Sequence, residues 1–224
     1  MAMLLSAQQI PGAADVTVHP LSLTYSGVWR GEGVESTYYL SYSGNIYPHG
    51  NDAGEDAFAF DRTQRDLRAS YRIVRAGTTF VRVFPNDMQF RASASVQDTR
   101  DSLIPGESFG LGGYENVRGL LEREIAGDRG YRGSVEVYGP DIGSRVLSSA
   151  HRLRLLAFFD TGALSNNGVK NASERVGQSV SSVGLGLRYA YGTSIGIRLD
   201  VAQMIDAAVT NGRNGSRGDN RVHF

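Results

Sequence analysis

The chain of 224 residues has no cysteine and no excess of either charge, since 23 basic residues balance 23 acidic ones. The absence of cysteine fits an oxidising compartment, where stray thiols are a liability. The neutral balance argues against a nucleic-acid partner, because binding to phosphates needs a basic face. The length and the 41% of hydrophobic residues permit one or two domains with a buried core.

Long apolar segments are also missing. No run of about 18 apolar residues occurs, which excludes a membrane-spanning helix. A membrane barrel is compatible with this pattern, because each of its strands needs only about 10 residues and half of them are polar. The start of the chain, residues 1–9, lacks a basic region and a sufficient apolar core, so it is not predicted to be a signal peptide.

Motifs for catalysis or cofactor binding are lacking as well. The four histidines are scattered without ligand spacing (His19, His49, His151 and His223), so no metal site is predicted. Two Gly-x-Ser-x-Gly sequences, at residues 106–110 and 192–196, fall in a predicted loop and at a predicted turn between two strands, so neither forms the strand-to-helix elbow of a hydrolytic triad. The glycines at 110, 112 and 113 are not followed by Gly-Lys-Ser/Thr, so they do not form a phosphate loop. We therefore expect no enzyme and no cofactor.

What the sequence does contain is alternation of apolar and polar residues with a period of two, which predicts β-strands. The clearest case is Met88 to Gln97, where apolar side chains fall on even positions and polar ones on odd positions. Similar segments predict about nine or ten strands. They cover residues 21–30, 38–46, 67–73, 88–97, 134–138, 152–160, 183–191 and 195–202, and a brief last strand includes Val222 and Phe224.

The predicted connections alternate between short turns and long polar loops. Short turns fall at residues 31–33, 85–86 and 192–194, and long loops at 47–66, 98–130, 165–179 and 206–219. This alternation is typical of outer-membrane barrels, so the predicted fold class is an all-β, antiparallel transmembrane β-barrel. The connection at 139–150 is longer than this scheme expects, and the sequence offers no explanation for it.

One glycine-spaced loop, Leu111 to Asp128, organises the rest of the chain. Gly112 and Gly113 permit backbone angles closed to other residues, and Gly119 allows a sharp turn directly after Arg118. A guanidinium on such a tip favours a carboxylate partner. Asp160 lies near the end of a predicted strand, on its polar side. We predict that Arg118 and Asp160 form the central pair.

The loop motif resembles a known family. Val117-Arg118-Gly119 after a double glycine, followed by Gly127-Asp128, resembles the inward-folded sixth extracellular loop of the haemolysin secretion/activation proteins. These proteins are the transporter half of two-partner secretion (TpsB). Leu120 departs from the family pattern, which usually has Tyr or Phe at this position.

A strand motif extends the resemblance. Phe158-x-Asp160-x-Gly162 resembles the segment that the loop arginine meets inside the barrel, a feature shared with the superfamily that includes the BamA insertase. The terminal Phe224 resembles the signal that the outer-membrane assembly machinery reads. By this resemblance, residues 1–224 are the C-terminal part of a sixteen-stranded transporter barrel, and the periplasmic POTRA domains are absent from this chain.

The resemblance implies translocation of an unfolded haemolysin- or adhesin-type exoprotein (TpsA type) across the bacterial outer membrane. The implied partners are that exoprotein, outer-membrane lipids and the assembly machinery. One alternative is an insertase of the same superfamily. Another is a soluble β-barrel that binds an apolar ligand, which would need apolar residues inside and polar residues outside.

Arginines on the polar sides of the predicted strands allow two interpretations. They could form a basic lining that guides an unfolded substrate, or they could pair with acids such as Glu136 and Asp200. The arginines concerned are Arg68, Arg72, Arg91, Arg152, Arg154, Arg188 and Arg198.

Overall fold

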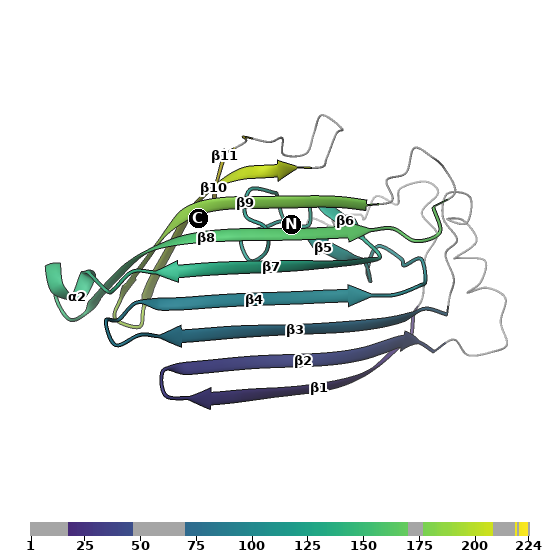
Figure 1. Cartoon of the computed structure of the whole chain (residues 1–224), viewed down its shortest axis with the longest axis horizontal. Helices are drawn as coiled ribbons and strands as arrows, with labels where there is room; N and C mark the ends of the chain where they lie inside the picture. Colours follow the sequence, from purple (N-terminus) through teal and green to yellow (C-terminus); the bar gives the residue numbers. More distant parts are fainter. Residues whose placement is uncertain (1–17, 47–69, 170–176, 208–217, 219, 224) are drawn as a thin grey trace, which may run out of the picture.

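The structure, a computed structural model, describes residues 18–46, 70–169, 177–207, 218 and 220–223. Nine strands form one antiparallel sheet, in which each strand pairs with the next one along the chain apart from the two strands of a loop (Figure 1). They are β1 (Pro20–Gly31), β2 (Val34–Asn45), β3 (Arg72–Val83), β4 (Gln89–Asp98), β7 (Arg129–Tyr138), β8 (His151–Ser165), β9 (Gly177–Tyr191), β10 (Ile195–Ala207) and β11 (Asn220–His223). The predicted all-β antiparallel fold of about nine or ten strands is confirmed.

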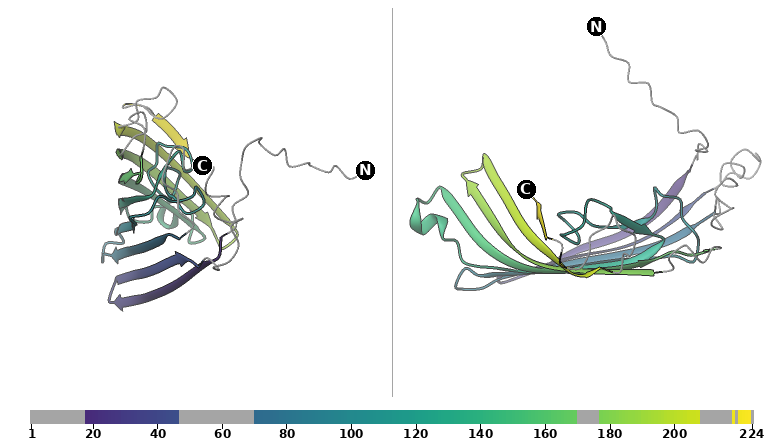
Figure 2. Two further views of the ribbon diagram at one scale, coloured as in Figure 1. Left: turned by 90° about the vertical axis from the view of Figure 1, so that its right-hand side faces the viewer. Right: turned by 90° about the horizontal axis from the view of Figure 1, so that it is seen from above.

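The sheet curves strongly, and the loop between β4 and β7 lies against its concave side (Figure 2). This inward loop, residues 99–128, contains a second small sheet of β5 (Phe109–Leu111) and β6 (Ile125–Gly127). We call the concave side of the large sheet the inner face and the convex side the outer face. In the large sheet β1 and β11 are the edge strands.

The outer face is apolar and exposed. On it Leu23 is 78% exposed and Leu185 is 68% exposed. The other large apolar side chains on this face include Leu21, Tyr25, Trp29, Tyr38, Leu40, Tyr42, Val96, Tyr131, Val135, Val137, Leu155, Phe159, Val183, Ile195, Ile197, Leu199 and Val201. Such a continuous apolar face suits hydrocarbon rather than water. It is the reverse of what a soluble ligand-binding barrel requires, so the structure argues against that alternative.

Helices contribute little to this architecture. Within the residues that the structure describes, no helix has both the length and the apolar character needed to cross a membrane.

Within the described residues, the predicted strand at residues 67–73 begins too early, and its two faces are reversed. The strand found here, β3, begins only at Arg72, and residues 67–69 lie outside the described part of the chain. Arg72 is exposed on the outer face, whereas Tyr71 and Ile73 are buried against Leu103 of the inward loop. Alternation separates two faces without saying which is inside, and here the loop supplies an apolar partner on the inner side.

Several predicted boundaries also shift. β7 starts at Arg129 rather than near residue 134, and β8 and β9 extend by several residues beyond Asp160 and before Val183. Glycines and small residues interrupt the apolar alternation in these extensions, so periodicity alone could not detect them. The predicted long loop at 47–66, residues 170–176 of the loop at 165–179, and residues 208–217 and 219 of the last loop lie outside the described residues.

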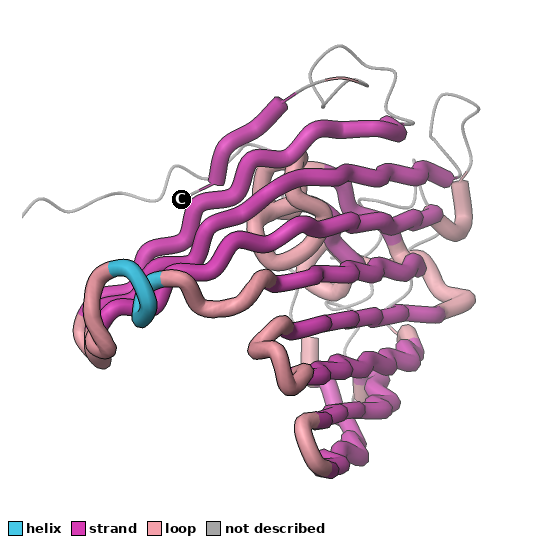
Figure 3. Tube along the Cα trace, turned by 60° about the vertical axis from the view of Figure 1, so that its left-hand side comes forward, coloured by secondary structure: helices cyan, strands magenta, loops and turns pink. Residues whose placement is uncertain are grey.

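The long connection at 139–150 now has a physical explanation. It contains a short helix, α2 (Gly143–Val146), which Figure 3 shows beside the ends of β7 and β8. Asp141 accepts backbone hydrogen bonds from Gly143 at 3.0 Å and Leu153 at 2.9 Å, which closes the connection on itself. Its own N–H donates to Asp87 in the β3–β4 turn at 2.8 Å, so two neighbouring turns are fastened together.

Asp87 gives this turn cluster a testable pH dependence. The hydrogen bond from the Asp141 N–H, and then the one from Arg154 at 2.6 Å, hold the pKa of Asp87 below its ordinary value. Because the pKa of Asp87 is lower in the folded state, its ionised form stabilises the folded protein fully at pH values above the unfolded-state pKa of about 3.9. This stabilisation is lost as the pH falls through the folded-state pKa. Because the pair is partly exposed, we expect it to contribute less than about 1 kcal/mol. Unfolding midpoints measured across acidic pH should therefore fall more steeply for the wild type than for Asp87→Asn. Identical profiles would contradict this assignment.

Candidate functional site

Arg118 lies at the tip of the inward loop, which three glycines shape. Gly112, Gly113 and Gly119 have φ angles of 111°, 107° and 114°, which are not readily available to other residues. A Cβ on Gly119 would lie 2.5 Å from the sulfur of Met204, so this glycine also lets the tip approach β10. The tip therefore sits directly on the inner face of the sheet, with Arg118 only 3% exposed.

The guanidinium of Arg118 is fully engaged with the sheet. Its Nε and Nη2 donate to the two oxygens of Asp160, each at 2.8 Å, and its backbone N–H also donates to Asp160 at 3.1 Å. Nη1 donates to Glu136 at 2.7 Å, and Nη2 donates to Ser134 at 3.2 Å. The guanidinium carbon lies 3.5 Å from the centre of the Phe158 ring. A two-pronged ion pair with stacking is a geometry that arginine forms and lysine does not.

The four residues that receive Arg118 come from two adjacent strands, and we call them the wall site: Ser134, Glu136, Phe158 and Asp160. In the register of β7 and β8, Ser134 pairs with Asp160 and Glu136 pairs with Phe158. All four point to the inner face because their positions share one parity along each strand. Ser134 donates to Asp160 at 2.6 Å, and Tyr138 donates to Glu136 at 2.8 Å, so the site is braced from within the sheet.

A third carboxylate, Asp200 on β10, lies next to the wall site. Arg188 binds both of its oxygens, at 2.8 and 2.9 Å, and Arg118 approaches it to 4.0 Å. Asp200 is 3% exposed and Asp160 is 0% exposed. The Arg118 and Arg188 cations thus lie among three buried acids, where an unpaired carboxylate would be costly.

Apolar contacts on both sides of Arg118 fasten the loop tip. Val117 and Leu120 are fully buried and belong to one cluster with Leu164, Val180 and Met204 of the sheet. Leu120 therefore fills with an aliphatic side chain the place where the resembled family usually has an aromatic one. On β8, Gly162 leaves room for the loop, since a Cβ there would lie 2.9 Å from Leu111.

His223 makes a further contact with the tip that the sequence did not reveal. The N–H of Gly119 donates to Nε2 of His223 on the edge strand β11 at 3.3 Å. The scattered spacing of the histidines in the sequence gives no signal of this contact. Phe224, the expected assembly signal, lies outside the described residues. Of the described residues, no group of three or more His, Cys, Asp or Glu side chains is arranged to hold a metal ion.

The base of the inward loop has its own polar anchors. Asp128 accepts hydrogen bonds from the N–H groups of Leu103 at 2.8 Å and Asn167 at 2.6 Å. Arg75 on β3 forms an ion pair with Glu107 of the loop at 2.7 Å. Gly127-Asp128 was part of the motif found in the sequence. Arg75 and Glu107 were missed because they are 32 residues apart and belong to no motif.

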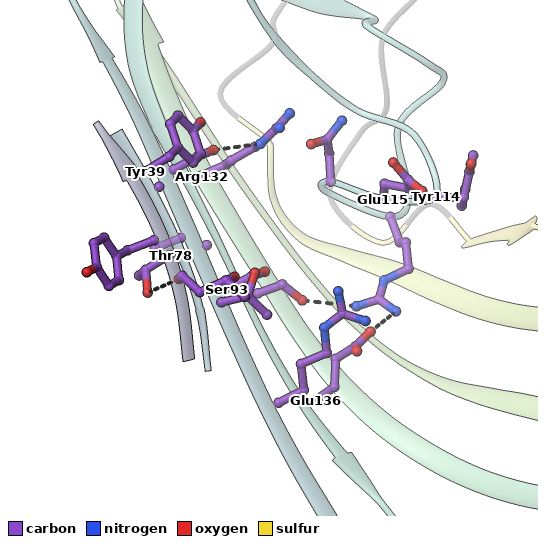
Figure 4. A pocket seen from close by; sticks show the side chains of 18 of the residues that line it. Tyr39, Thr78, Ser93, Tyr114, Glu115, Arg132 and Glu136 are labelled. Atoms are coloured by element: carbon purple, nitrogen blue, oxygen red, sulfur yellow. Dashed lines mark hydrogen bonds and ion pairs between the residues drawn. The ribbon is translucent and has the colours of Figure 1, made fainter. Parts of the chain in front are cut away.

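The polar-face arginines divide between ion pairs and the lining of a hollow. Arg154 and Arg188 pair with Asp87 and Asp200, as in ordinary packing. Arg91 and Arg198, together with Arg132, line a hollow of about 710 Å³ between the sheet and the loop tip. Figure 4 shows Arg132, Ser93 and Glu136 on the wall of this hollow, with Tyr114 and Glu115 of the loop on the other side. Arg152 is exposed at the start of β8, Arg72 faces outward, and Arg68 lies outside the described residues.

These features define a class of protein. A curved antiparallel sheet with an apolar outer face, and a loop fastened to its inner face by a buried arginine, is the architecture of part of a membrane β-barrel. The model of the haemolysin secretion/activation protein family ShlB/FhaC/HecB matches residues 23–189. The chain belongs to this family.

A solved structure supports the fold. CdiB from Escherichia coli matches with a TM-score of 0.71 and 16% sequence identity, over 95% of this chain and 37% of that chain. This chain therefore spans well under half of the length of CdiB. A search of curated proteins found no match.

Proposed function

We propose that the chain is part of the outer-membrane transporter of a two-partner secretion system, which translocates an unfolded haemolysin- or adhesin-type exoprotein to the cell surface. The observation that carries the proposal is the inward loop, whose arginine is buried in the wall site on the inner face. Membership of the haemolysin secretion/activation family and similarity to the fold of CdiB support it. In this proposal residues 1–224 form the C-terminal part of the barrel, and POTRA domains belong to the rest of the protein.

The two faces of the sheet indicate what each side of it would contact in the membrane. The apolar outer face would contact outer-membrane lipids, because the side chains on it are aliphatic and aromatic and broadly exposed. Phe224 would be read by the assembly machinery. The inner face would line the path of the exoprotein. Translocation of this kind neither makes nor breaks a covalent bond, so the proposal includes no catalytic residue and no cofactor.

Within this mechanism the inward loop occupies the path and must move for transport. Arg118 would anchor the loop in its resting position, with Val117 and Gly119 shaping the tip. Phe158, Asp160 and Gly162 would form the receiving surface, since Asp160 binds the guanidinium, Phe158 stacks on it and Gly162 leaves space for Leu111. The hollow lined by Arg91, Arg132 and Arg198 would be the part of the path that the loop leaves unfilled.

The mutation that tests this function is Arg118→Ala in the intact protein that carries this sequence. Loss of the guanidinium leaves Asp160 and Glu136 without a cation, a change that costs roughly 3–5 kcal/mol locally. We expect secretion of the exoprotein to fall about tenfold or more, while the protein still inserts into the outer membrane because the sheet itself is unchanged. Secretion and insertion are measured in the same cells, by immunoblots of the medium and of the membrane fraction.

Arg100→Ala is the matched control, because Arg100 is an exposed arginine at the start of the same loop. It should leave secretion unchanged. Normal secretion by Arg118→Ala would contradict the proposed role of the loop. If secretion stayed normal and other outer-membrane proteins became depleted instead, the insertase of the same superfamily would be favoured.

A further inference from the structure

The wall site keeps its geometry independently of the loop residue that occupies it. Its four residues stand on β7 and β8, whose register pairs Ser134 with Asp160 and Glu136 with Phe158. The hydrogen bond from Ser134 to Asp160, at 2.6 Å, and that from Tyr138 to Glu136, at 2.8 Å, involve no loop residue. When Arg118 leaves, both carboxylates therefore still point to the same place. A preorganised receptor of this kind loses little entropy when it binds a new ligand.

The chemistry of the wall site selects a guanidinium. Both oxygens of Asp160 accept hydrogen bonds at 2.8 Å from one edge of the Arg118 guanidinium, and Glu136 accepts one at 2.7 Å from its remaining nitrogen. The Phe158 ring stacks on the guanidinium, with its centre 3.5 Å from the guanidinium carbon. A planar group with five donors satisfies all three partners at once. A lysine ammonium is a compact point charge that cannot engage both carboxylates and the ring face in this way.

Ser182 provides a second, independent indication of a ligand at this place. It pairs with Asp160 across β8 and β9, and it is fully buried. Among the residues that the structure describes, its hydroxyl has no hydrogen-bond partner. Its Cβ lies 3.6 Å from where a Cβ on Gly119 would be, so Ser182 faces the underside of the loop tip. A buried hydroxyl without a partner is unfavourable, and a guanidinium that enters on a backbone path different from that of the loop tip could hydrogen-bond to it.

The wall site is also reachable from the hollow. Arg118, Ser134 and Glu136 belong to the residues that line this space of about 710 Å³. A polypeptide in the hollow could therefore present a side chain to Glu136 while Arg118 is still in place. Exchange of one guanidinium for another avoids the intermediate in which the two buried carboxylates have no cation.

We propose that the wall site is a receptor for arginine side chains of the polypeptide that passes along the inner face. An arriving guanidinium competes with Arg118 for Asp160 and Glu136, and the exchange releases the inward loop. This inference rests on the proposed transport function and adds to it a chemical preference for the passing chain. Ser182 contributes a hydrogen bond that the resting loop does not use.

The test measures peptide binding by Arg118→Ala protein, in its intact form in lipid nanodiscs. The probes are fluorescent, unstructured glycine–serine peptides that carry either several arginines or the same number of lysines. We expect the arginine peptide to bind about tenfold more tightly than the lysine peptide, and more tightly to Arg118→Ala than to the wild type. Adding Asp160→Asn should weaken arginine binding at least about tenfold. Adding Phe158→Leu should remove most of the preference for arginine, because both carboxylates remain and the stacking surface is lost.

The receptor proposal would be overturned if Arg118→Ala bound the two peptides with equal affinity. It would also be overturned if Asp160→Asn left the affinity for the arginine peptide unchanged. Correct folding of each variant is verified by the shift in gel mobility between heated and unheated samples. Phe158→Leu, which retains every charge, tests the inference if Asp160→Asn does not fold. Because the assay contains no exoprotein, the receptor can fail while transport stands, and the secretion experiment with Arg118→Ala can fail while peptide binding stands.

Discussion

Asp160→Asn is expected to release the inward loop from the sheet. The substitution keeps the size of the side chain but removes the charge that binds Nε and Nη2 of Arg118, each at 2.8 Å. The guanidinium is 3% exposed and cannot be solvated in place. Glu136 still holds Nη1 at 2.7 Å, so we expect a cost near the low end for breaking a buried pair, about 3 kcal/mol. This corresponds to a shift of about a hundredfold in the ratio of seated to released loop.

The shift is measured by the distance between two spin labels. The chain contains no cysteine, so Leu121→Cys on the loop and Ser194→Cys in the β9–β10 turn can be labelled without background from this chain. Leu121 is 59% exposed and tolerates a label. We expect one narrow distance in the wild type and a broad distribution in Asp160→Asn. Asp98→Asn, an exposed carboxylate at the end of β4, is the control and should give the wild-type distance. A narrow, unchanged distance in Asp160→Asn would refute the anchor.

Gly119→Ala should also unseat the loop, although no charge is changed. The φ angle of 114° at this position is strained for any residue with a Cβ, at a cost of about 1–3 kcal/mol. The added methyl would also lie 2.5 Å from the sulfur of Met204. We expect a secretion defect close to that of Arg118→Ala, and Met204→Ala should not rescue it fully because the backbone strain persists.

Gly106→Ala is the control for this prediction. Gly106 belongs to the same loop, and a Cβ there would meet nothing within 4 Å. Its secretion should equal that of the wild type. If Gly119→Ala also secreted normally, the close approach of the tip to β10 would not matter for function.

Local patterns predicted the strands and the central contact well. Alternation separated the two faces of most strands, because apolar side chains occur at every second position along them. The glycines around Arg118 and the acid on the polar side of β8 predicted a pair that the structure places in contact. Glu136 was considered only as a possible partner for other arginines. Its contact with Arg118 depends on the register between β7 and β8, which the sequence does not specify.

The features that were missed depend on contacts between distant segments. Most of β3 was missed because its centre, residues 76–79, is Ala-Gly-Thr-Thr and has no apolar alternation. Packing explains the glycine at position 77, because the ring of Tyr39 on β2 covers it and a Cβ there would lie 2.4 Å from that ring. His223 and the Arg75–Glu107 pair reach the loop from strands far away in the sequence. No local periodicity reports such contacts, because they depend on how the loop folds back onto the sheet.

The most direct test of the account is the coupling between Arg118 and Asp160, measured by a double-mutant cycle on the seated fraction of the loop. Each single substitution, Arg118→Ala or Asp160→Ala, leaves a buried charge without its main partner, whereas the double mutant removes both charges. The account predicts that the double mutant loses less than the sum of the two single losses, by about 2–3 kcal/mol. Losses that add to within about 0.5 kcal/mol would mean that the two residues act independently. The anchored loop, and the function proposed from it, would then be contradicted.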